Sequence, residues 1–164
     1  MDDVDPCTAN LEHWEALASF HGHGEDAYYD LDLLRSGGTL MCAEELDAVR
    51  RATDGSGVGG LDVLHLQCHI GCDAISLARM GARVTAADFS RGALDRLEVL
   101  AAECGVEVRT VEADAMALPA ELASSFDLVY ATIGVLCWIR DVGAWMRSVA
   151  AVLRPGGRLA LVEL

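Results

Sequence analysis

The chain contains no lysine: all 12 of its basic residues are arginines. A lysine Schiff base, a phosphate-loop lysine and a lysine general base are therefore excluded. Bases of any kind are scarce beside the 26 acids, and the formal net charge is −14. Contacts with nucleic-acid phosphates or with an anionic membrane surface need clustered positive charge. We therefore expect neither a nucleic acid nor a membrane as a partner.

Long apolar runs are also missing, so the sequence predicts no membrane span. The first five residues include three aspartates, whereas a secretory signal starts with basic residues and continues with an apolar run. The six cysteines are scattered, mostly beside apolar residues, and are not spaced as a disulfide framework. We interpret them as reduced thiols that fill the core, and we expect a cytoplasmic protein.

The length of 164 residues suits one domain, and its character changes along the chain. Residues 1–53 predict a polar-faced N-terminal helical cap. Residues 54–60 are rich in glycine and predict a linker, because a phosphate-binding glycine loop would follow a strand rather than precede one. Residues 61–164 are expected to form the main domain, referred to below as the core. Within the cap we expect helices over 11–20, with Asn10 as N-cap, over 25–34 and over 41–51.

Beyond residue 60, short apolar runs alternate with amphipathic segments. This alternation is typical of an α/β fold: a Rossmann-like, doubly wound parallel sheet with helices on both faces. Ser90 and Asp141 are the expected N-caps of two of its helices. We expect strands over 61–66, 83–87, 106–111, 127–131 and 158–162, helices over 73–80, 91–104 and 142–153, and a turn over 154–157.

In such a sheet, ligands bind beyond the carboxyl ends of the strands. An acid, Asp88, follows the second predicted strand and could hold the two hydroxyls of a ribose. Asp114 and its small neighbour Ala115 follow the third, where they could meet an adenine amino group and leave room for the ring. Gly71, in the first turn, lets the backbone approach a ligand closely. Together these residues favour an adenosine-bearing ligand.

The string His65-Leu66-Gln67-Cys68-His69 followed by Gly71, together with 84–90, 126–138 and 153–159, resembles the class I S-adenosylmethionine-dependent methyltransferases. The string and 84–90 also resemble a bacterial subgroup of small methyltransferases with this "HLQCH" form of the first motif, whose N-terminal segment resembles 28–31. The commoner form has an acid where His65 stands and glycines where Gln67 and His69 stand. The resemblance covers most of the chain and implies a sheet order of 3-2-1-4-5.

The resemblance implies a role for several side chains. Gln67, Cys68, His69 and Gly71 would wrap the methionine part of S-adenosylmethionine. Asp88 would hold the ribose, and Phe89 would pack on the adenine. Asp114 would meet the adenine amino group, with Ala115 beside it, and Thr132 and Ile133 would face the sulfonium and the substrate. Tyr28 and Tyr29 would belong to a lid, and Trp138 would line the substrate side.

The function expected is methyl transfer to a small-molecule acceptor, with no catalytic residue assigned. A non-catalytic module that binds an adenosine ligand is one alternative, and a nucleotide-dependent oxidoreductase is another, although the first turn lacks the G-x-G-x-x-G pattern. His69 could be a general base or a loop histidine bonded to backbone. We assign no metal, because His65, Cys68, His69 and Cys72 lie on a strand, a loop and a helix start and would converge poorly on one ion.

The class I methyltransferase sheet normally carries two further strands after the fifth. This sequence stops within its fifth predicted strand, so we expect a shortened domain that lacks the last two strands. The fifth strand would then be an apolar edge, which is an aggregation liability unless it is covered. Either the sequence is a fragment of a longer domain, or a second copy of the chain or another partner covers this edge.

Overall fold

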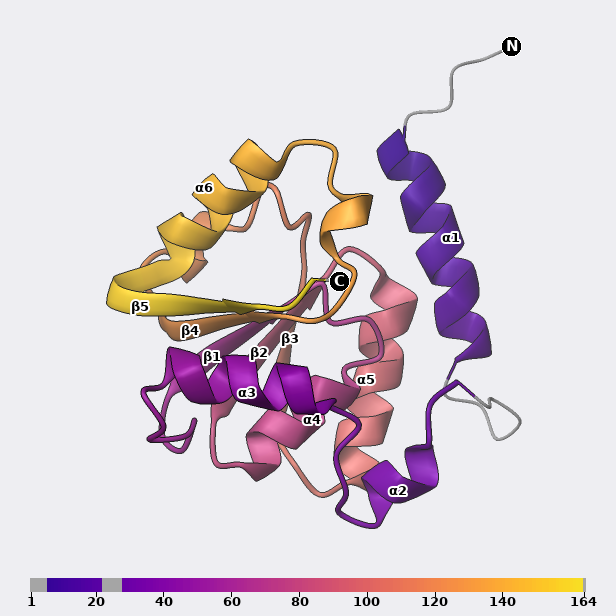
Figure 1. Ribbon diagram of the computed structural model, residues 1–164. Helices are drawn as coiled ribbons and strands as arrows, with labels where there is room; N and C mark the ends of the chain where they lie inside the picture. Colours follow the sequence, from indigo (N-terminus) through magenta and orange to yellow (C-terminus); the bar gives the residue numbers. More distant parts are fainter. Residues whose placement is uncertain (1–5, 22–27, 164) are drawn as a thin grey trace.

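A computed structural model of the protein describes residues 6–21 and 28–163. Five parallel strands form one sheet in the order β3-β2-β1-β4-β5, which confirms the predicted fold class and strand order (Figure 1). The strands are β1 (Asp62–Leu66), β2 (Arg83–Asp88), β3 (Val108–Glu112), β4 (Phe126–Ala131) and β5 (Leu153–Leu161). The helices are α1 (Pro6–Phe20), α2 (Leu31–Arg35), α3 (Ala43–Ala52), α4 (Cys72–Arg79), α5 (Arg91–Glu103) and α6 (Val142–Val152), with short 3-10 turns η1 (Ala120–Leu122) and η2 (Leu136–Trp138).

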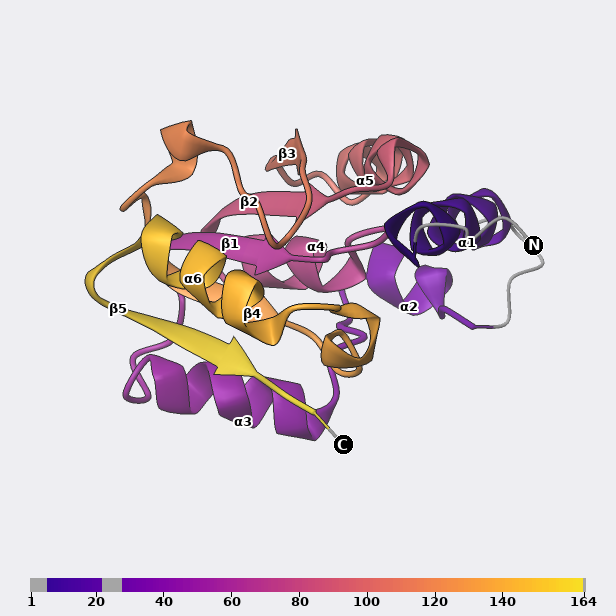
Figure 2. The ribbon, with the colours of Figure 1, turned by 90° about the horizontal axis from the view of Figure 1, so that it is seen from above.

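Helices cover both faces of the sheet. α3, α4 and α5 lie on one face and α6 on the other, while α1 runs beside α5 (Figure 1). Figure 2 shows the same layers from above, with α6 over the sheet and α3 beneath β5. The central strands β1 and β4 are buried almost throughout, as expected for strands covered on both sides. Alternate residues of each strand feed two separate apolar clusters, one on each face.

Two of the three predicted N-caps, Ser90 and Asp141, are confirmed. The Ser90 hydroxyl accepts a hydrogen bond from the Ala93 amide, and the Asp141 carboxylate accepts one from the Ala144 amide. Such bonds satisfy backbone donors that the first turn of a helix leaves unpaired. The two caps fix where α5 and α6 begin, and therefore where the preceding loops turn back over the carboxyl ends of the strands.

Two predictions for local structure were wrong. Helix α1 begins at Pro6, so Asn10 lies inside it, and the Asn10 side chain instead donates to the Trp138 carbonyl at 3.2 Å. The predicted turn over 154–157 is part of β5, which pairs with β4 through a register shift between Phe126 and Leu128. Proline and glycine are tolerated there because β5 is an edge strand of the described sheet and the shift absorbs the extra residues.

The described part of the predicted N-terminal cap contains the three helices α1, α2 and α3, joined by non-helical segments. Only Leu31–Arg35 of the helix expected over 25–34 is observed, and residues 25–27 lie outside the described residues. α3 packs directly against β5, and Met41 and Val49 belong to the main apolar cluster. The segment over 54–60 is held at both ends: Arg158 binds the Asp54 carboxylate at 2.7 Å, and the Gly60 amide donates to the Gly81 carbonyl at 2.8 Å. The division into cap, linker and core stays a prediction, as does a partner on the β5 edge.

Arginines and acids are paired at the amino ends of the strands. Asp62 of β1 binds Arg83 of β2 at 2.6 Å and Arg154 of β5 at 2.8 Å, and Arg154 also binds Asp127 of β4 at 2.8 Å. Arg83 and then Arg154 lower the pKa of Asp62 to about 2.

Among the described helices, none is long and apolar enough to cross a membrane.

The start of α4 depends on Gly71, which has a φ of +71° in the left-handed region. A Cβ at this position would lie 2.3 Å from Cδ1 of Leu97, a fully buried residue of α5. We therefore expect Gly71→Ala to lower the free energy of unfolding by about 2–4 kcal/mol, through left-handed strain and overpacking together. The matched control is Gly105→Ala, at φ +67° with open space around it, which should cost only about 1–2 kcal/mol. Equal losses in urea unfolding of the two variants would contradict the steric part.

Candidate functional site

One cavity of about 860 Å³ lies beyond the carboxyl ends of the strands, between the loops that follow them and α1. Pockets of this size hold drug-sized ligands and cofactors. The structure brings all of the predicted site residues to this one cavity. They are Tyr28, Tyr29, Gln67, Cys68, His69, Gly71, Asp88, Phe89, Asp114, Ala115, Thr132, Ile133 and Trp138. Their placement is a structural fact, whereas their individual roles stay predictions.

The turn after β1 has an alternating left-handed backbone. Gln67, His69 and Gly71 have φ values of +56°, +48° and +71°. Only glycine adopts this conformation without strain, and other residues lose about 1–2 kcal/mol each. The commoner form of the resembled motif has glycines at the first two of these positions, and the backbone shows why. The side chains of Gln67 and His69 must offset that strain through contacts of their own.

Such contacts are present at both positions. The Gln67 amide oxygen accepts a hydrogen bond at 2.9 Å from the indole of Trp145, a fully buried residue of α6. The His69 ring lies 3.3 Å from the Tyr29 hydroxyl through its Nδ1, and its edge meets the Trp14 ring at 5.1 Å between centroids. The turn is therefore fixed from both sides, by α6 and by the N-terminal segment.

Asp88 joins this turn to the end of β2. One carboxylate oxygen accepts the His69 amide at 2.8 Å, and the other accepts the Ser90 amide at 2.9 Å. The residue is only 7% exposed, and burial raises its pKa although the backbone hydrogen bonds partly oppose the shift. Each carboxylate oxygen has a second lone pair, so Asp88 can still accept hydrogen bonds from a ligand in the cavity.

The third predicted loop presents Asp114 at the rim of the cavity. Its carboxylate accepts the Met116 amide at 2.8 Å, which makes a tight turn, and the side chain is otherwise exposed. The next residue, Ala115, is buried in the second apolar cluster. Phe89, after β2, is partly buried beside the same end of the cavity. An acid, a methyl group and an aromatic ring therefore meet at this end.

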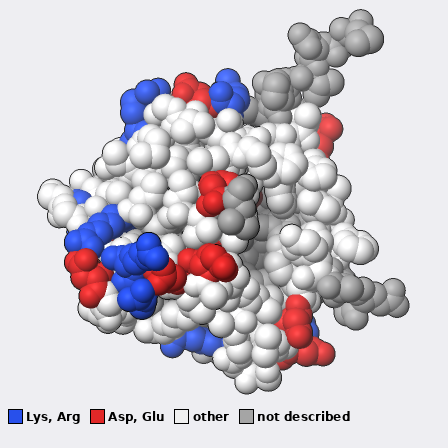
Figure 3. Space-filling model, in the orientation of Figure 1, with Lys and Arg blue, Asp and Glu red and all other residues white. Residues whose placement is uncertain are grey.

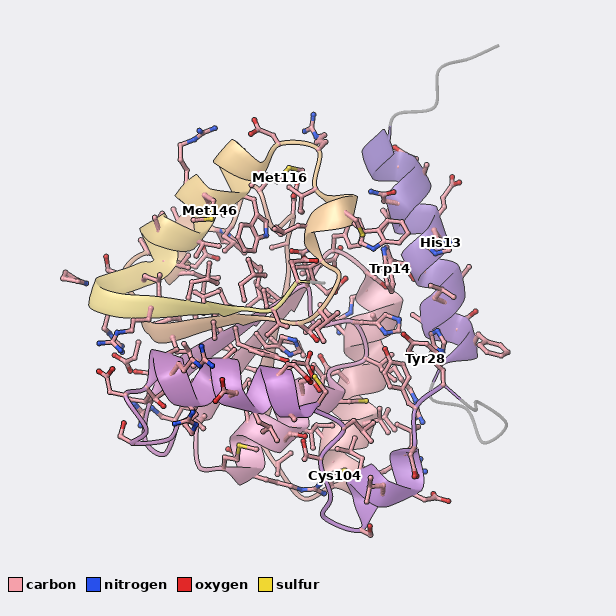
Figure 4. The ribbon with its side chains drawn as sticks, in the orientation of Figure 1. His13, Trp14, Tyr28, Cys104, Met116 and Met146 are labelled. Carbon is pink, nitrogen blue, oxygen red and sulfur yellow. The ribbon has the colours of Figure 1, made fainter. Side chains whose placement is uncertain are left out.

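Aromatic rings line one stretch of the cavity wall, beside the turn that holds His69. Trp14 of α1 meets Trp138 of η2 edge to face, with centroids 5.2 Å apart, and His13 stacks on Trp138 at 5.4 Å. Figure 4 shows the side chains of His13 and Trp14 on α1. His21, buried at the end of α1, meets Tyr29 at 5.3 Å. No spacing in the sequence placed α1, and with it Trp14, over the strand ends. Tyr28 lines the same side but is 74% exposed.

A buried polar cluster that the sequence analysis missed forms the floor of the cavity. Glu45 of α3 is 5% exposed and accepts hydrogen bonds from the Thr132 hydroxyl, from the Ile133 amide at 3.4 Å and from the Cys42 amide at 2.9 Å. Burial raises its pKa, but these bonds together outweigh burial and hold the pKa below its ordinary value. Thr132, predicted to face the ligand, is thus already bonded to a carboxylate.

Asp73, in the first turn of α4, is the second acid of this floor. It accepts a hydrogen bond from the Tyr130 hydroxyl at 3.1 Å. Burial, and then the nearby charge of Glu45, raise its pKa to about 6. Beside it, His65 of β1 lies 4.9 Å from the Tyr130 ring and is 1% exposed, and burial lowers the pKa of His65 to about 3. His65 is therefore a neutral imidazole at physiological pH.

The charge of the cavity has one sign. Among the described residues that line it, five are acids and none is an arginine. The acids are Asp30, Glu45, Asp73, Asp88 and Asp114. Figure 3 shows the hollow beside α1, with the arginines of that face at its periphery. Acidic walls in a low-dielectric site favour a cationic ligand and oppose a polyanion such as a pyrophosphate.

The cysteines of the site are not nucleophiles. Burial raises the pKa of Cys68 well above its ordinary value and that of Cys72 to about 12, so both stay protonated thiols. The cysteines whose side chains are described, at 42, 68, 72, 104 and 137, are free. In the same described part of the chain, no group of three or more His, Cys, Asp or Glu side chains is arranged to hold a metal ion.

A parallel sheet of this order with a cavity beyond its carboxyl ends defines the doubly wound α/β proteins that bind nucleotide-like ligands. Within that class, residues 63–157 match a family model described as "Methyltransferase domain". The chain belongs to this methyltransferase family. The match begins within β1 and ends in β5, so α3 and the N-terminal helices lie outside it.

Comparisons with individual proteins agree. The chain is 36% identical over 128 residues to a ubiquinone biosynthesis O-methyltransferase of Caulobacter sp. strain K31, covering 76% of this chain and 50% of that protein. It is 38% identical to a demethylmenaquinone methyltransferase of Corynebacterium glutamicum strain R, covering 63% and 42%. A solved S-adenosylmethionine-dependent methyltransferase from Mesorhizobium loti is 32% identical, with a TM-score of 0.58 over 71% of this chain and 52% of that chain. The chain thus spans about half the length of the curated relatives it matches.

The Asp73 carboxylate makes a testable contribution to stability. Its pKa is about 6 when folded and about 4 when unfolded, so the folded state binds the proton more tightly. The free energy of unfolding should therefore fall as pH rises from about 4 to about 6. We expect Asp73→Asn, which keeps an acceptor for Tyr130, to raise this free energy at pH 8 by on the order of 1–2 kcal/mol and to change it little at pH 4.

Urea unfolding at the two pH values measures this difference. The control is Asp95→Asn, which removes an exposed carboxylate of α5 that pairs with Arg91 at 2.7 Å. An Asp73→Asn variant that is less stable than the wild type at pH 8 would show that Asp73 is not a destabilised acid.

Proposed function

We propose that this domain binds S-adenosylmethionine in the cavity beyond the strand ends and directs its methyl group to a small-molecule acceptor. The observation that carries the proposal is the charge of the cavity, where five carboxylates and no arginine line the described wall. S-adenosylmethionine carries a sulfonium and an ammonium against one carboxylate, so its net charge is positive. A nicotinamide dinucleotide carries an anionic pyrophosphate, which such a wall opposes.

The described residues fit the adenosine end of this cofactor. Asp88 has free lone pairs for the ribose hydroxyls while its two backbone bonds keep it in place. Asp114 can accept the adenine amino group, and Ala115 beside it leaves space for the ring. Phe89 would cover one face of the adenine. Membership in the methyltransferase family and the name of the Mesorhizobium loti relative support the same cofactor.

The aromatic stretch of the cavity wall suits the acceptor. When bound, S-adenosylmethionine supplies an electrophilic methyl group, so the protein has to orient the acceptor and exclude water. The rings of Trp14, Trp138 and Tyr29 form an apolar wall against which a flat molecule can stack. The names of the two bacterial relatives, one for ubiquinone biosynthesis and one for demethylmenaquinone, support an acceptor of this shape. Buried free thiols, as at Cys68, support the cytoplasm as its location.

Calorimetric titration distinguishes this proposal from an oxidoreductase. We expect S-adenosylmethionine and S-adenosylhomocysteine to bind, and NAD to neither bind nor compete with them. Binding of NAD in place of the sulfur ligands would refute the proposal. Incubation with methyl-labelled S-adenosylmethionine and small quinols, followed by mass spectrometry, then separates methyl transfer from binding alone.

A variant tests the adenosine end separately. Asp114 is exposed, so Asp114→Ala should leave the melting temperature close to that of the wild type. Loss of a charge-assisted hydrogen bond to the ligand should weaken S-adenosylhomocysteine binding by about tenfold or more. Asp95→Ala removes an equal charge outside the cavity and should not change the affinity. Equal affinities of the two variants would exclude Asp114 from the site.

A further inference from the structure

The floor of the cavity holds more negative charge than the protein itself neutralises. Glu45 and Asp73 receive hydrogen bonds from hydroxyl and amide groups, all of which are uncharged donors. No arginine or lysine lies among the described residues that line this cavity. The two carboxylates also repel each other, as the effect of Glu45 on the pKa of Asp73 shows. Glu45 is buried and Asp73 is partly buried, and two like charges held away from water are costly unless something cationic joins them.

His65 gives an independent indication of a ligand at the same place. Both of its ring nitrogens are buried without a hydrogen-bond partner, although the ring lines the cavity. Buried polar atoms without partners are rare in folded proteins and ask for an explanation. Because the imidazole is neutral, one ring nitrogen is always a hydrogen-bond acceptor. The floor therefore offers three acceptors, two of them anionic, and lacks a cationic donor.

A primary ammonium group has the matching chemistry, with one positive charge and three N–H donors. We propose that Glu45, Asp73 and His65 form a subsite for the primary ammonium group at the amino-acid end of the cofactor. This inference rests on the proposed function, which places the cofactor in this cavity. In the commoner form of the family's first motif an acid occupies the position of His65. Here a neutral histidine stands on β1, and the carboxylates come from α3 and α4 instead.

The origin of Glu45 makes the inference specific to this chain. The residue lies on α3, outside the 63–157 segment that matches the family model. Its position is fixed by the Cys42 amide at the start of α3 and by the loop after β4, through Thr132 and Ile133. Glu45 therefore links α3 to the loop after β4, which borders the cavity. A carboxylate placed only to cap α3 would not need to reach the loop beyond β4.

Three adenosine probes that differ only at the 5′ sulfur substituent test this subsite. 5′-Methylthioadenosine lacks the amino-acid end, 5′-(3-aminopropylthio)adenosine keeps an ammonium without a carboxylate, and S-adenosylhomocysteine has both. We expect the wild type to bind the two amine-bearing probes at least tenfold more tightly than 5′-methylthioadenosine in calorimetric titration at pH 8. We expect Glu45→Gln and Asp73→Asn each to reduce this preference by tenfold or more. Affinity for 5′-methylthioadenosine should change less than twofold.

Controls separate this inference from folding and from the proposed function. Glu44→Gln removes a neighbouring exposed carboxylate from α3 and should leave the preference unchanged. Unchanged affinity of the Glu45 and Asp73 variants for 5′-methylthioadenosine shows that they are folded. A wild type that binds all three probes equally, or a variant that loses affinity for all three equally, would overturn the subsite while the adenosine site stands. A wild type that binds none of the probes would overturn the proposed function and this inference together.

Discussion

The geometry of the cavity depends on two hydrogen bonds to one carboxylate. Asp88 accepts the His69 amide from the turn after β1 and the Ser90 amide from the start of α5. The first bond stabilises a backbone that twice adopts a left-handed conformation at a residue other than glycine. The second fixes the residue that caps α5. Two neighbouring loops of the cavity wall are thereby held in register.

Charge is distributed unequally along the strands, and this distribution prepares the site. At the amino ends, Asp62 and Asp127 are neutralised by arginines from the neighbouring strands. At the carboxyl ends, the acids receive only uncharged donors from the described residues. A chain without lysine and with 12 arginines can leave one end of its sheet without bases while it pairs charges at the other. Acids are thus paired with arginines at one end of the sheet, and an attraction for cations is kept at the other.

Most of the fold and about half of the site environment followed from sequence patterns. The strands and the caps at Ser90 and Asp141 carry strong local signals. An acid that directly follows a buried parallel strand must lie at the carboxyl edge of the sheet, where the cavity is. Glu45, Asp73 and Trp14 were missed because their positions at the cavity arise from packing between distant segments. Glu45 reads as an ordinary charged residue in an amphipathic helix, and only its contact with Thr132, 87 residues away, reveals it. The strand at 154–157 was missed because proline and glycine signal a turn unless an edge strand accommodates them.

The position of Glu45 on α3 has a consequence for how the sequences of such proteins evolve. The segment that carries the family pattern runs from β1 to β5, whereas one of the carboxylates beneath the cavity belongs to a helix before it. With a neutral residue at position 65, the floor keeps its two carboxylates only while α3 carries its acid. The two positions are therefore expected to covary among related chains. A pattern confined to the sheet would overlook that coupling, since half of it lies in the preceding helix.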